Sequence, residues 1–89
     1  MRSPVGEIDI IARRGGVLAF IEVKARPSYT QAVYAVTKRQ QNRIVRAAML
    51  YIARRPGLSE LAVRFDVMLV SGPWRPPQHL TDAWRPDTD

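Results

Sequence analysis

Cysteine is absent from the sequence, and its absence excludes both a disulfide framework and a metal site built on thiolates. Long apolar runs are also missing, since none approaches the roughly 20 residues that a membrane-spanning helix needs. Residues 1–7 contain no apolar segment of the kind found in signal peptides. These absences favour a cytoplasmic protein that has no membrane partner.

Acidic residues are missing from a long part of the chain, because none occurs between Val23 and Ser59 although the whole chain has eight. The basic residues of this stretch are Lys24, Arg26, Lys38, Arg39, Arg43, Arg46, Arg54 and Arg55. In a chain of net charge +6, such a segment favours a polyanionic partner, most commonly nucleic acid. Composition alone leaves open a second interpretation, in which a cationic helix only keeps the protein in solution.

The length and overall composition are those of one small soluble domain. The chain has 89 residues, of which 46% are hydrophobic and 25% are charged. We expect residues 1–89 to form a single domain with its core within 5–70. Prolines are frequent after residue 70, so the segment 71–89 is expected to be irregular, apart from a short turn or strand around 79–84.

Two segments rich in isoleucine and valine predict a β-hairpin. Residues 6–13 and 17–24 have the composition of strands, and Gly15 and Gly16 lie between them. A Gly-Gly pair suits a two-residue turn because both positions tolerate positive φ. The two strands are therefore expected to pair in the antiparallel direction.

A helix is predicted to begin after Thr37, because Thr37 and Gln40 match a capping box. One apolar stripe at helical spacing follows, made of Ile44, Ala47, Ala48, Tyr51 and Ile52. Pro56-Gly57 should end this helix, residues 62–70 form another strand, and residues 26–36 read as a loop. The strand–helix–strand order predicts parallel strands. The expected fold class is therefore α/β, with a small mixed sheet made of an antiparallel hairpin and a βαβ unit.

One face of the predicted hairpin gathers three carboxylates and a lysine. In the register of a two-residue turn, Asp9 lies opposite Glu22 and Glu7 lies opposite Lys24, and opposed residues share a face. Opposed carboxylates destabilise a sheet unless a positive group lies between them. Hard divalent cations such as Mg²⁺ bind carboxylate oxygens, polarise phosphoryl oxygens and lower the pKa of a bound water. Lys24 would then orient that water or neutralise a phosphate.

A polar face whose charges merely pair, as Glu7 with Lys24, is the alternative interpretation. Leu18 and Phe20 precede Glu22 on its own face, while alanine, isoleucine and valine line the opposite face of the same strand. A strand that is apolar on both faces is typical of the interior of a sheet. Carboxylates in such a place are partly buried and need compensation, which favours the cation site.

These residues also resemble a family pattern. Gly-Glu-Ile-Asp-Ile-Ile-Ala over 6–12 and Phe-Ile-Glu-Val-Lys over 20–24 resemble the PD-(D/E)xK nuclease signature. Within that superfamily the chain is most similar to the YraN-like family of bacterial proteins, which is similar to archaeal Holliday junction resolvases. The likeness continues through residues 35–38, 46–48 and 64–67, so it covers most of the chain up to Val70.

The resemblance implies a restriction-endonuclease-like fold and in-line hydrolysis of a phosphodiester with Mg²⁺ or Mn²⁺ as cofactor. It assigns Asp9 and Glu22 as metal ligands and Lys24 as the catalytic lysine, while Glu7 matches a characteristic position and joins the catalytic set. Proteins of this type usually have an N-terminal helix before the first catalytic strand. Only six residues precede Glu7 here, so we expect this helix to be absent from the chain.

Basic residues that lie off the apolar stripe of the predicted helix are the expected nucleic-acid-binding set: Lys38, Arg39, Arg43 and Arg46. The sequence thus predicts a metal-dependent endonuclease domain acting on DNA, including branched or structured DNA. One alternative is a nucleic-acid-binding module on a nuclease fold with little or no catalysis. Another is a protein-interaction domain whose uncovered surface pairs with a second subunit, as in a homodimer.

Several other residues have simpler interpretations. Asp66 is expected to form a salt bridge with Arg64 or a helix arginine, and His79 to have a structural or surface role. Trp74 and Trp84 are expected to cover the core rather than stack on bases. For Tyr29 and Tyr34, in the expected loop, a substrate contact and a plain surface position remain equally open. Capping alone is expected to explain Gln40.

Overall fold

The computed structural model describes residues 2–3 and 6–86, with side chains for residues 8–86. A four-stranded sheet has the order β3-β4-β5-β6, and a separate two-stranded ribbon pairs β1 with β2. The strands are β1 (Arg2–Ser3), β2 (Gly6–Glu7), β3 (Ile10–Arg14), β4 (Val17–Ala25), β5 (Ala62–Val70) and β6 (Gln78–Trp84). The helices are α1 (Tyr29–Tyr34), α2 (Lys38–Ala53) and the 3-10 turn η1 (Pro56–Leu58).

The predicted hairpin is present as β3 and β4. Arg14 pairs with Val17 and Ile10 pairs with Ile21, which is the register expected for a two-residue turn. Gly15 adopts φ 58°, a conformation that a side chain would strain. The expected antiparallel pairing and register over this part of the hairpin are therefore confirmed.

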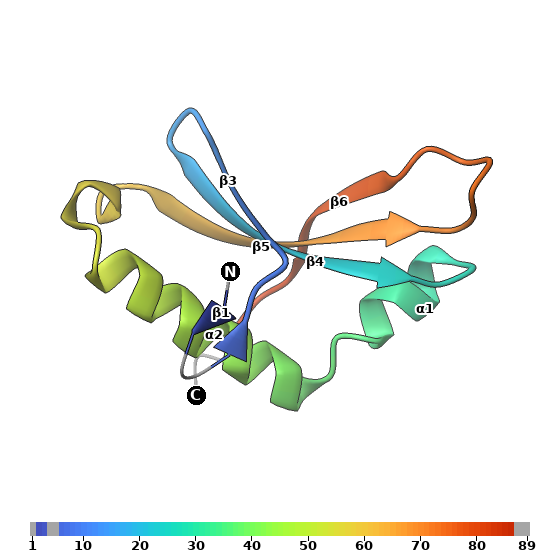
Figure 1. The fold of residues 1–89 in the computed structure, drawn as a ribbon, viewed down its shortest axis with the longest axis horizontal. Coiled ribbons are helices and arrows are strands. Elements are labelled where there is room, and N and C mark those ends of the chain that lie inside the picture. Colours follow the sequence, from blue (N-terminus) through green and yellow to red (C-terminus); the bar gives the residue numbers. More distant parts are fainter. Residues whose placement is uncertain (1, 4–5, 87–89) are drawn as a thin grey trace.

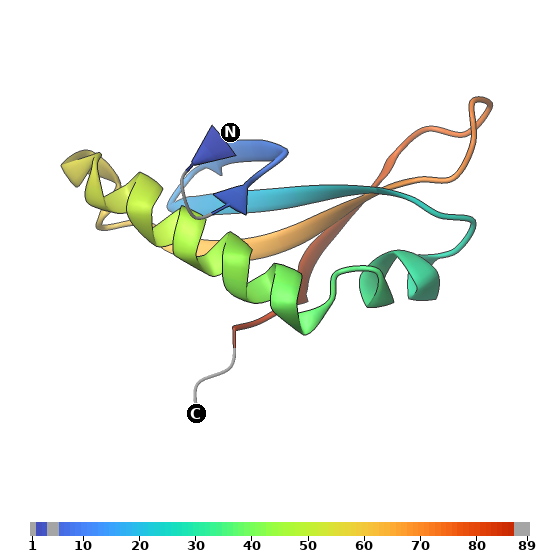
Figure 2. The same cartoon turned by 60° about the horizontal axis from the view of Figure 1, so that its bottom comes forward.

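The predicted βαβ unit is also present, since β4 pairs with β5 in the parallel direction and α2 lies between them in the chain. β4 is an inner strand, buried on the face of Leu18 and Phe20 and also on the face of Ala19 and Ile21. The expected mixed α/β sheet, consistent with a restriction-endonuclease-like core, is confirmed. Figures 1 and 2 show α2 crossing one face of this sheet, with α1 at the end where β4 finishes.

α2 begins as the sequence predicts, because the Thr37 hydroxyl accepts a hydrogen bond from the Gln40 N–H at 3.2 Å. The apolar stripe of the helix buries Ile44, Ala47 and Ala48 against the sheet. There they meet aromatic rings that stack in a row, with centroids 5.9 Å apart for Phe20–Phe65 and 4.4 Å for Phe65–Trp84. None of the helices in the described part of the chain is long and apolar enough to cross a membrane.

Two expectations about the strands and loops are wrong. Residues 26–36 are not simply a loop, because Ser28 caps α1 by accepting the Gln31 N–H at 3.3 Å. The strand expected over 6–13 is interrupted at residues 8–9, and β2 pairs with β1, so that Glu7 stands opposite Arg2 rather than Lys24. The buried side chain of Ile8 explains the break, since the chain turns there toward the core.

The C-terminal segment is more regular than its prolines suggest. Residues 78–84 form β6, which pairs with β5 in the antiparallel direction around a bulge. Trp84 is buried and stacks on Phe65, which confirms that it covers the core. Trp74 is 94% exposed, so the same expectation is wrong for Trp74.

Candidate active site

Asp9 reaches β4 from just outside the hairpin ladder. Its Oδ2 accepts a hydrogen bond from the Val23 N–H at 2.9 Å. The regular pairing of β3 with β4 ends at Ile21, so this carboxylate takes the position that the next carbonyl of β3 would have occupied. The local break at Asp9 therefore turns a strand residue into a carboxylate fixed beside Glu22.

Glu22 is nearly fully buried on β4, on the face that α2 covers. Its Oε2 accepts a hydrogen bond from Gln40 Nε2 at 2.9 Å, and Gln40 Oε1 accepts one from Lys24 Nζ at 3.2 Å. The amide of Gln40 therefore links Glu22 and Lys24, which lie two residues apart on the same face of the strand. Because Thr37 caps the first turn of α2, this amide is held in place by the start of the helix.

Gln40 is the residue that the sequence analysis missed. Its backbone N–H takes part in the cap as expected, but its side chain contacts Glu22 and Lys24 instead of reaching back toward Thr37. One signal was available in the sequence: Gln40 lies four residues before Ile44, on the same stripe that faces the sheet. A polar residue on a buried stripe needs a polar partner, and the carboxylate and the lysine of β4 are such partners.

The electrostatics of Asp9 reflect its neighbours. Burial would raise the pKa of Asp9, but hydrogen bonds with Glu22 and from the Val23 N–H, with the positive charge of Lys24, hold this pKa below its usual value. The Asp9 carboxyl group therefore lies next to that of Glu22, although Asp9 is placed there by the break in the strand and not by a paired position in the ladder.

The donor set fits a hard divalent cation. Mg²⁺ is commonly bound by one or two carboxylates, with water and substrate phosphate completing its shell, and Asp9 and Glu22 supply two carboxylates at one point. No group of three or more acidic or histidine side chains suited to a metal occurs among the described residues. The side chain of Glu7 lies outside the described residues.

Three of the four expected nucleic-acid-binding residues line one groove. Arg39, Arg43 and Arg46 surround a hollow of about 570 Å³ together with Asn42, Val45 and Pro86. Their spacing of three and four residues puts them on one side of α2. Lys38 is not among the residues that line this groove.

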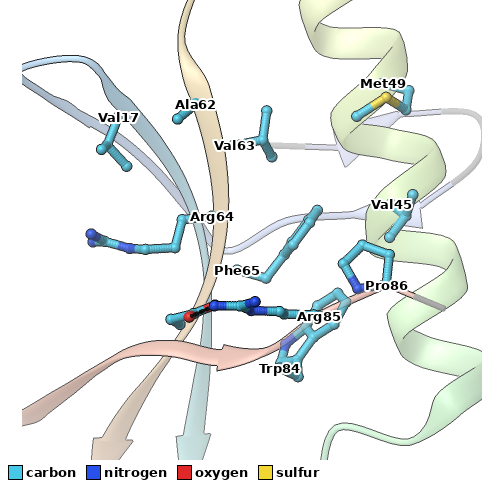
Figure 3. A pocket seen from close by; sticks show the side chains of 11 residues that line it. Val17, Val45, Met49, Ala62, Val63, Arg64, Phe65, Trp84, Arg85 and Pro86 are labelled. Atoms are coloured by element: carbon cyan, nitrogen blue, oxygen red, sulfur yellow. Dashed lines mark hydrogen bonds and ion pairs between the residues drawn. The ribbon is translucent and has the colours of Figure 1, made fainter. Parts of the chain in front are cut away.

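A neighbouring apolar cavity, of about 550 Å³, lies between α2 and the strands β5 and β6 (Figure 3). Val45 and Pro86 line both this cavity and the basic groove. The one carboxylate in its lining, Asp82, is paired with Arg85 at 2.7 Å. Neither Asp9 nor Glu22 lines this cavity, so it is distinct from the carboxylate pair.

Asp66 forms a second acidic centre, on the opposite face of the sheet, since it stands beside Ile21 in the register of β4 and β5. It is fully buried and accepts two hydrogen bonds from the Arg64 guanidinium, both at 2.9 Å. The Asp82 N–H donates a third at 2.9 Å, and His79 Nε2 lies 2.7 Å from the carboxylate. Burial would raise the pKa of Asp66, but these partners lower it. The expected salt bridge with Arg64 is confirmed, and His79 has a structural contact.

The model of the family described as "Uncharacterised protein family UPF0102" matches residues 1–70. This chain belongs to the UPF0102 family. The YraN-like resemblance seen in the sequence is thereby confirmed at the level of the family.

Relatives in several bacteria are similar over nearly all of the chain. A UPF0102 protein of Paramagnetospirillum magneticum is 52% identical over 85 residues, which cover 96% of this chain and 65% of the relative. One of Bradyrhizobium is 52% identical and matches 93% of this chain and 58% of its own length. One of Nitrobacter winogradskyi is 49% identical over 98% of this chain and 73% of its own length. The chain thus spans about 65% of the length of the first of these relatives.

Proposed function

We propose that this UPF0102 chain carries the active site of a metal-dependent endonuclease that hydrolyses phosphodiester bonds in DNA, including branched or structured DNA. The observation that supports the proposal is the arrangement of Asp9, Glu22 and Lys24, in which two carboxyl groups meet and Gln40 links one of them to the lysine. The superfamily that the sequence resembles uses the same kinds of residue for this reaction.

Asp9 and Glu22 are the proposed metal ligands. Two carboxylates at one point repel each other unless a proton or a cation lies between them. A divalent cation between them would cancel this repulsion, and Mg²⁺ or Mn²⁺ suits their oxygen atoms. When bound, such an ion would polarise a phosphoryl oxygen of the substrate and lower the pKa of a bound water.

Lys24 is the proposed catalytic residue beside this pair. Its ammonium group donates to Gln40, which in turn donates to Glu22, so the position of the charge is coupled to that of the carboxylate. From there Lys24 would orient the attacking water or neutralise a phosphate oxygen as negative charge develops in the transition state. Gln40 is a positioning residue in this scheme, because its amide holds both groups.

The basic groove of α2 is the proposed source of general affinity for the phosphate backbone. Arg39, Arg43 and Arg46 are exposed at its lining, and no acidic residue occurs in this part of the chain. Contacts of this kind depend on salt rather than on base sequence. Affinity and chemistry would then be supplied by different residues, which makes them separable by substitution.

A nucleic-acid-binding module without catalysis is the second candidate. It is favoured by one observation, that only two carboxylates meet at the site within the described residues. A binding module would need the basic groove but not Lys24. The two candidates therefore differ in what the loss of Lys24 does.

The deciding experiment measures cleavage of duplex, single-stranded and junction DNA by the full-length protein in Mg²⁺ or Mn²⁺. We expect Lys24→Ala to lower kcat about 100- to 1,000-fold, as for other groups that stabilise transition-state charge, and to leave DNA binding nearly unchanged. Arg54→Ala is the matched control, since it removes the same charge from the exposed C-terminal end of α2. Cleavage that is equal in Lys24→Ala and wild type would refute the assigned role, and no cleavage of any substrate would favour the binding module.

A further inference from the structure

The exposed aromatic residues belong to segments that lie at one end of the sheet. Of the aromatic residues, Phe20, Phe65 and Trp84 are buried, and Tyr51 is half-buried against Phe20. The side chains of the remaining three, Trp74, Tyr34 and Tyr29, are 94%, 79% and 56% exposed. The tyrosines are the first and last residues of α1, and Trp74 lies in the loop between β5 and β6.

This end of the sheet is also where Lys24 lies. β4 and β5 are parallel and end together, with Lys24 beside Leu69 and Ala25 beside Val70 in the register. α1 follows β4 and the loop of Trp74 follows β5, and both lie at the same end of the molecule in Figures 1 and 2. In open α/β sheets, ligands commonly bind outside the carboxyl ends of the strands.

The two segments adjoin each other around a shallow hollow. The hollow has a volume of about 490 Å³ and is lined by Ala25, Arg26, Pro27, Val70, Ser71, Gly72 and Pro73. The Arg26 N–H donates to the Val70 carbonyl at 3.2 Å, which ties the segment after β4 to the end of β5. Trp74 is the next residue after this lining. It lies in a turn in which the Arg75 N–H donates to the Gly72 carbonyl at 3.4 Å.

The charge around the hollow has one sign. Arg26 lies in its lining and Arg75 is the neighbour of Trp74, and both side chains are exposed. No acidic residue occurs in the sequence from residue 67 to residue 81 or from 23 to 59, which includes both segments. Exposed aromatic rings interspersed with cations are the combination by which proteins bind unpaired nucleotides, since bases stack on the rings while cations meet the phosphates.

From this juxtaposition we propose that the strand-end surface of Trp74, Arg75 and Arg26 binds unpaired nucleotides, with a base stacked on the Trp74 indole. The inference rests on the proposed function only in that the ligand is a nucleic acid, and it specifies which form is bound at the ends of β4 and β5. A substrate with a single-stranded segment would be held by that segment on Trp74, while its phosphates meet the two arginines.

Trp74 permits a clean test because its side chain contributes little to the fold. A side chain that is 94% exposed buries almost no apolar surface, so Trp74→Ala should leave the melting temperature unchanged. The test measures binding by full-length protein to an oligothymidylate, to an abasic strand of equal length and to a blunt duplex. A chelator is present throughout, so that neither cleavage nor the metal site affects the result.

We expect the oligothymidylate to quench tryptophan fluorescence in wild type but not in Trp74→Ala, which retains Trp84. Trp74→Ala should weaken binding of this strand by about fivefold or more, while Trp74→Phe retains most of the affinity. Binding of the abasic strand and the duplex should not change. Arg75→Ala, in contrast, should reduce the salt slope for single strands by about 0.7, the value for one phosphate contact.

Equal weakening of the abasic strand, or a loss of affinity for the duplex of the same size, would overturn the stacking proposal. An unchanged affinity for the oligothymidylate in Trp74→Ala would overturn it as well. These outcomes are separate from failure of the nuclease proposal, which concerns cleavage in the presence of metal. A protein that binds the strand through Trp74 but cuts nothing would retain this inference and lose the catalytic one.

Discussion

Two acidic centres lie on opposite faces of the same pair of strands, and they differ in their partners. Asp66 on β5 is fully buried, and its two carboxylate oxygens each accept a hydrogen bond from the Arg64 guanidinium. His79 and the Asp82 N–H also contact this carboxylate. Asp9 and Glu22 instead meet each other, a backbone N–H and the neutral amide of Gln40. The first arrangement neutralises a charge inside the fold, whereas the second brings two like charges together.

The difference explains why burial alone does not identify a functional carboxylate. A buried charge with an arginine beside it is already compensated, so its environment explains it as part of the structure. Two neighbouring carboxyl groups without an arginine between them have an arrangement that a divalent cation would satisfy. The comparison therefore predicts that substitution of Asp66 will lower the stability of the fold, whereas substitution of Asp9 will abolish stabilisation by metal.

The largest effect is expected for Asp66→Ala, which should lower the free energy of unfolding by about 3 kcal/mol. The change leaves the Arg64 guanidinium without its partner and the Asp82 N–H without an acceptor at the bulge of β6. Denaturant titration of wild type and variant measures the difference. Glu60→Ala, which removes an exposed carboxylate, is the control, and an equally small change in both variants would mean that Asp66 does not secure β6.

Metal binding should stabilise the other centre. If Asp9 and Glu22 bind Mg²⁺ or Mn²⁺, a concentration of 100 times Kd should stabilise the folded wild type by about 2.7 kcal/mol, and Asp9→Ala should abolish this gain. Thermal denaturation with and without the cation measures it. Asp82→Ala, which removes a carboxylate from the distant pair with Arg85, should retain the full stabilisation. A gain that persists in Asp9→Ala would place the metal elsewhere.

The smallest effect is expected for Gln40→Ala, which should lower kcat/KM for cleavage by about tenfold or more, as for groups that orient a metal ligand. The change removes the hydrogen bonds of the amide to Glu22 and Lys24 but neither charged group. Gln41→Ala is the matched control in the same turn, because its side chain donates to the Val36 carbonyl instead. A loss of activity of the same size in both variants would indicate general damage to the start of α2.

The local parts of this fold follow from short-range patterns in the sequence. Gly15 and Gly16 determine the turn, and the turn determines the register of β3 with β4 from Arg14–Val17 to Ile10–Ile21. Thr37 likewise caps α2 where the spacing of polar and apolar residues predicts. Each of these relations involves neighbours in the chain or in one hairpin, where backbone geometry allows few alternatives.

Other features depended on contacts that no local pattern encodes. The strand before Asp9 breaks where the Ile8 side chain enters the core, and β2 consequently pairs with β1, with Glu7 opposite Arg2 in the register instead of Lys24. Gln40 meets Glu22 and Lys24 across 18 and 16 residues of sequence. These outcomes required the packing of α2 against the sheet, which determines what each polar group finds as a partner.

The two tryptophans show which features the sequence pattern predicts and which depend on the tertiary structure. Their sequence contexts are alike, since both lie near prolines and arginines after residue 70, and both were expected to cover the core. Trp84 is buried because β6 places it on Phe65, while Trp74 is exposed because the turn after β5 directs it away from the sheet.

By itself the sequence determined the hairpin, the helix and the residue types of the acidic site, through periodicity and turn chemistry. Only the tertiary structure decided which carboxylates were compensated and which aromatic rings stayed in water, because burial depends on elements that meet from distant parts of the chain.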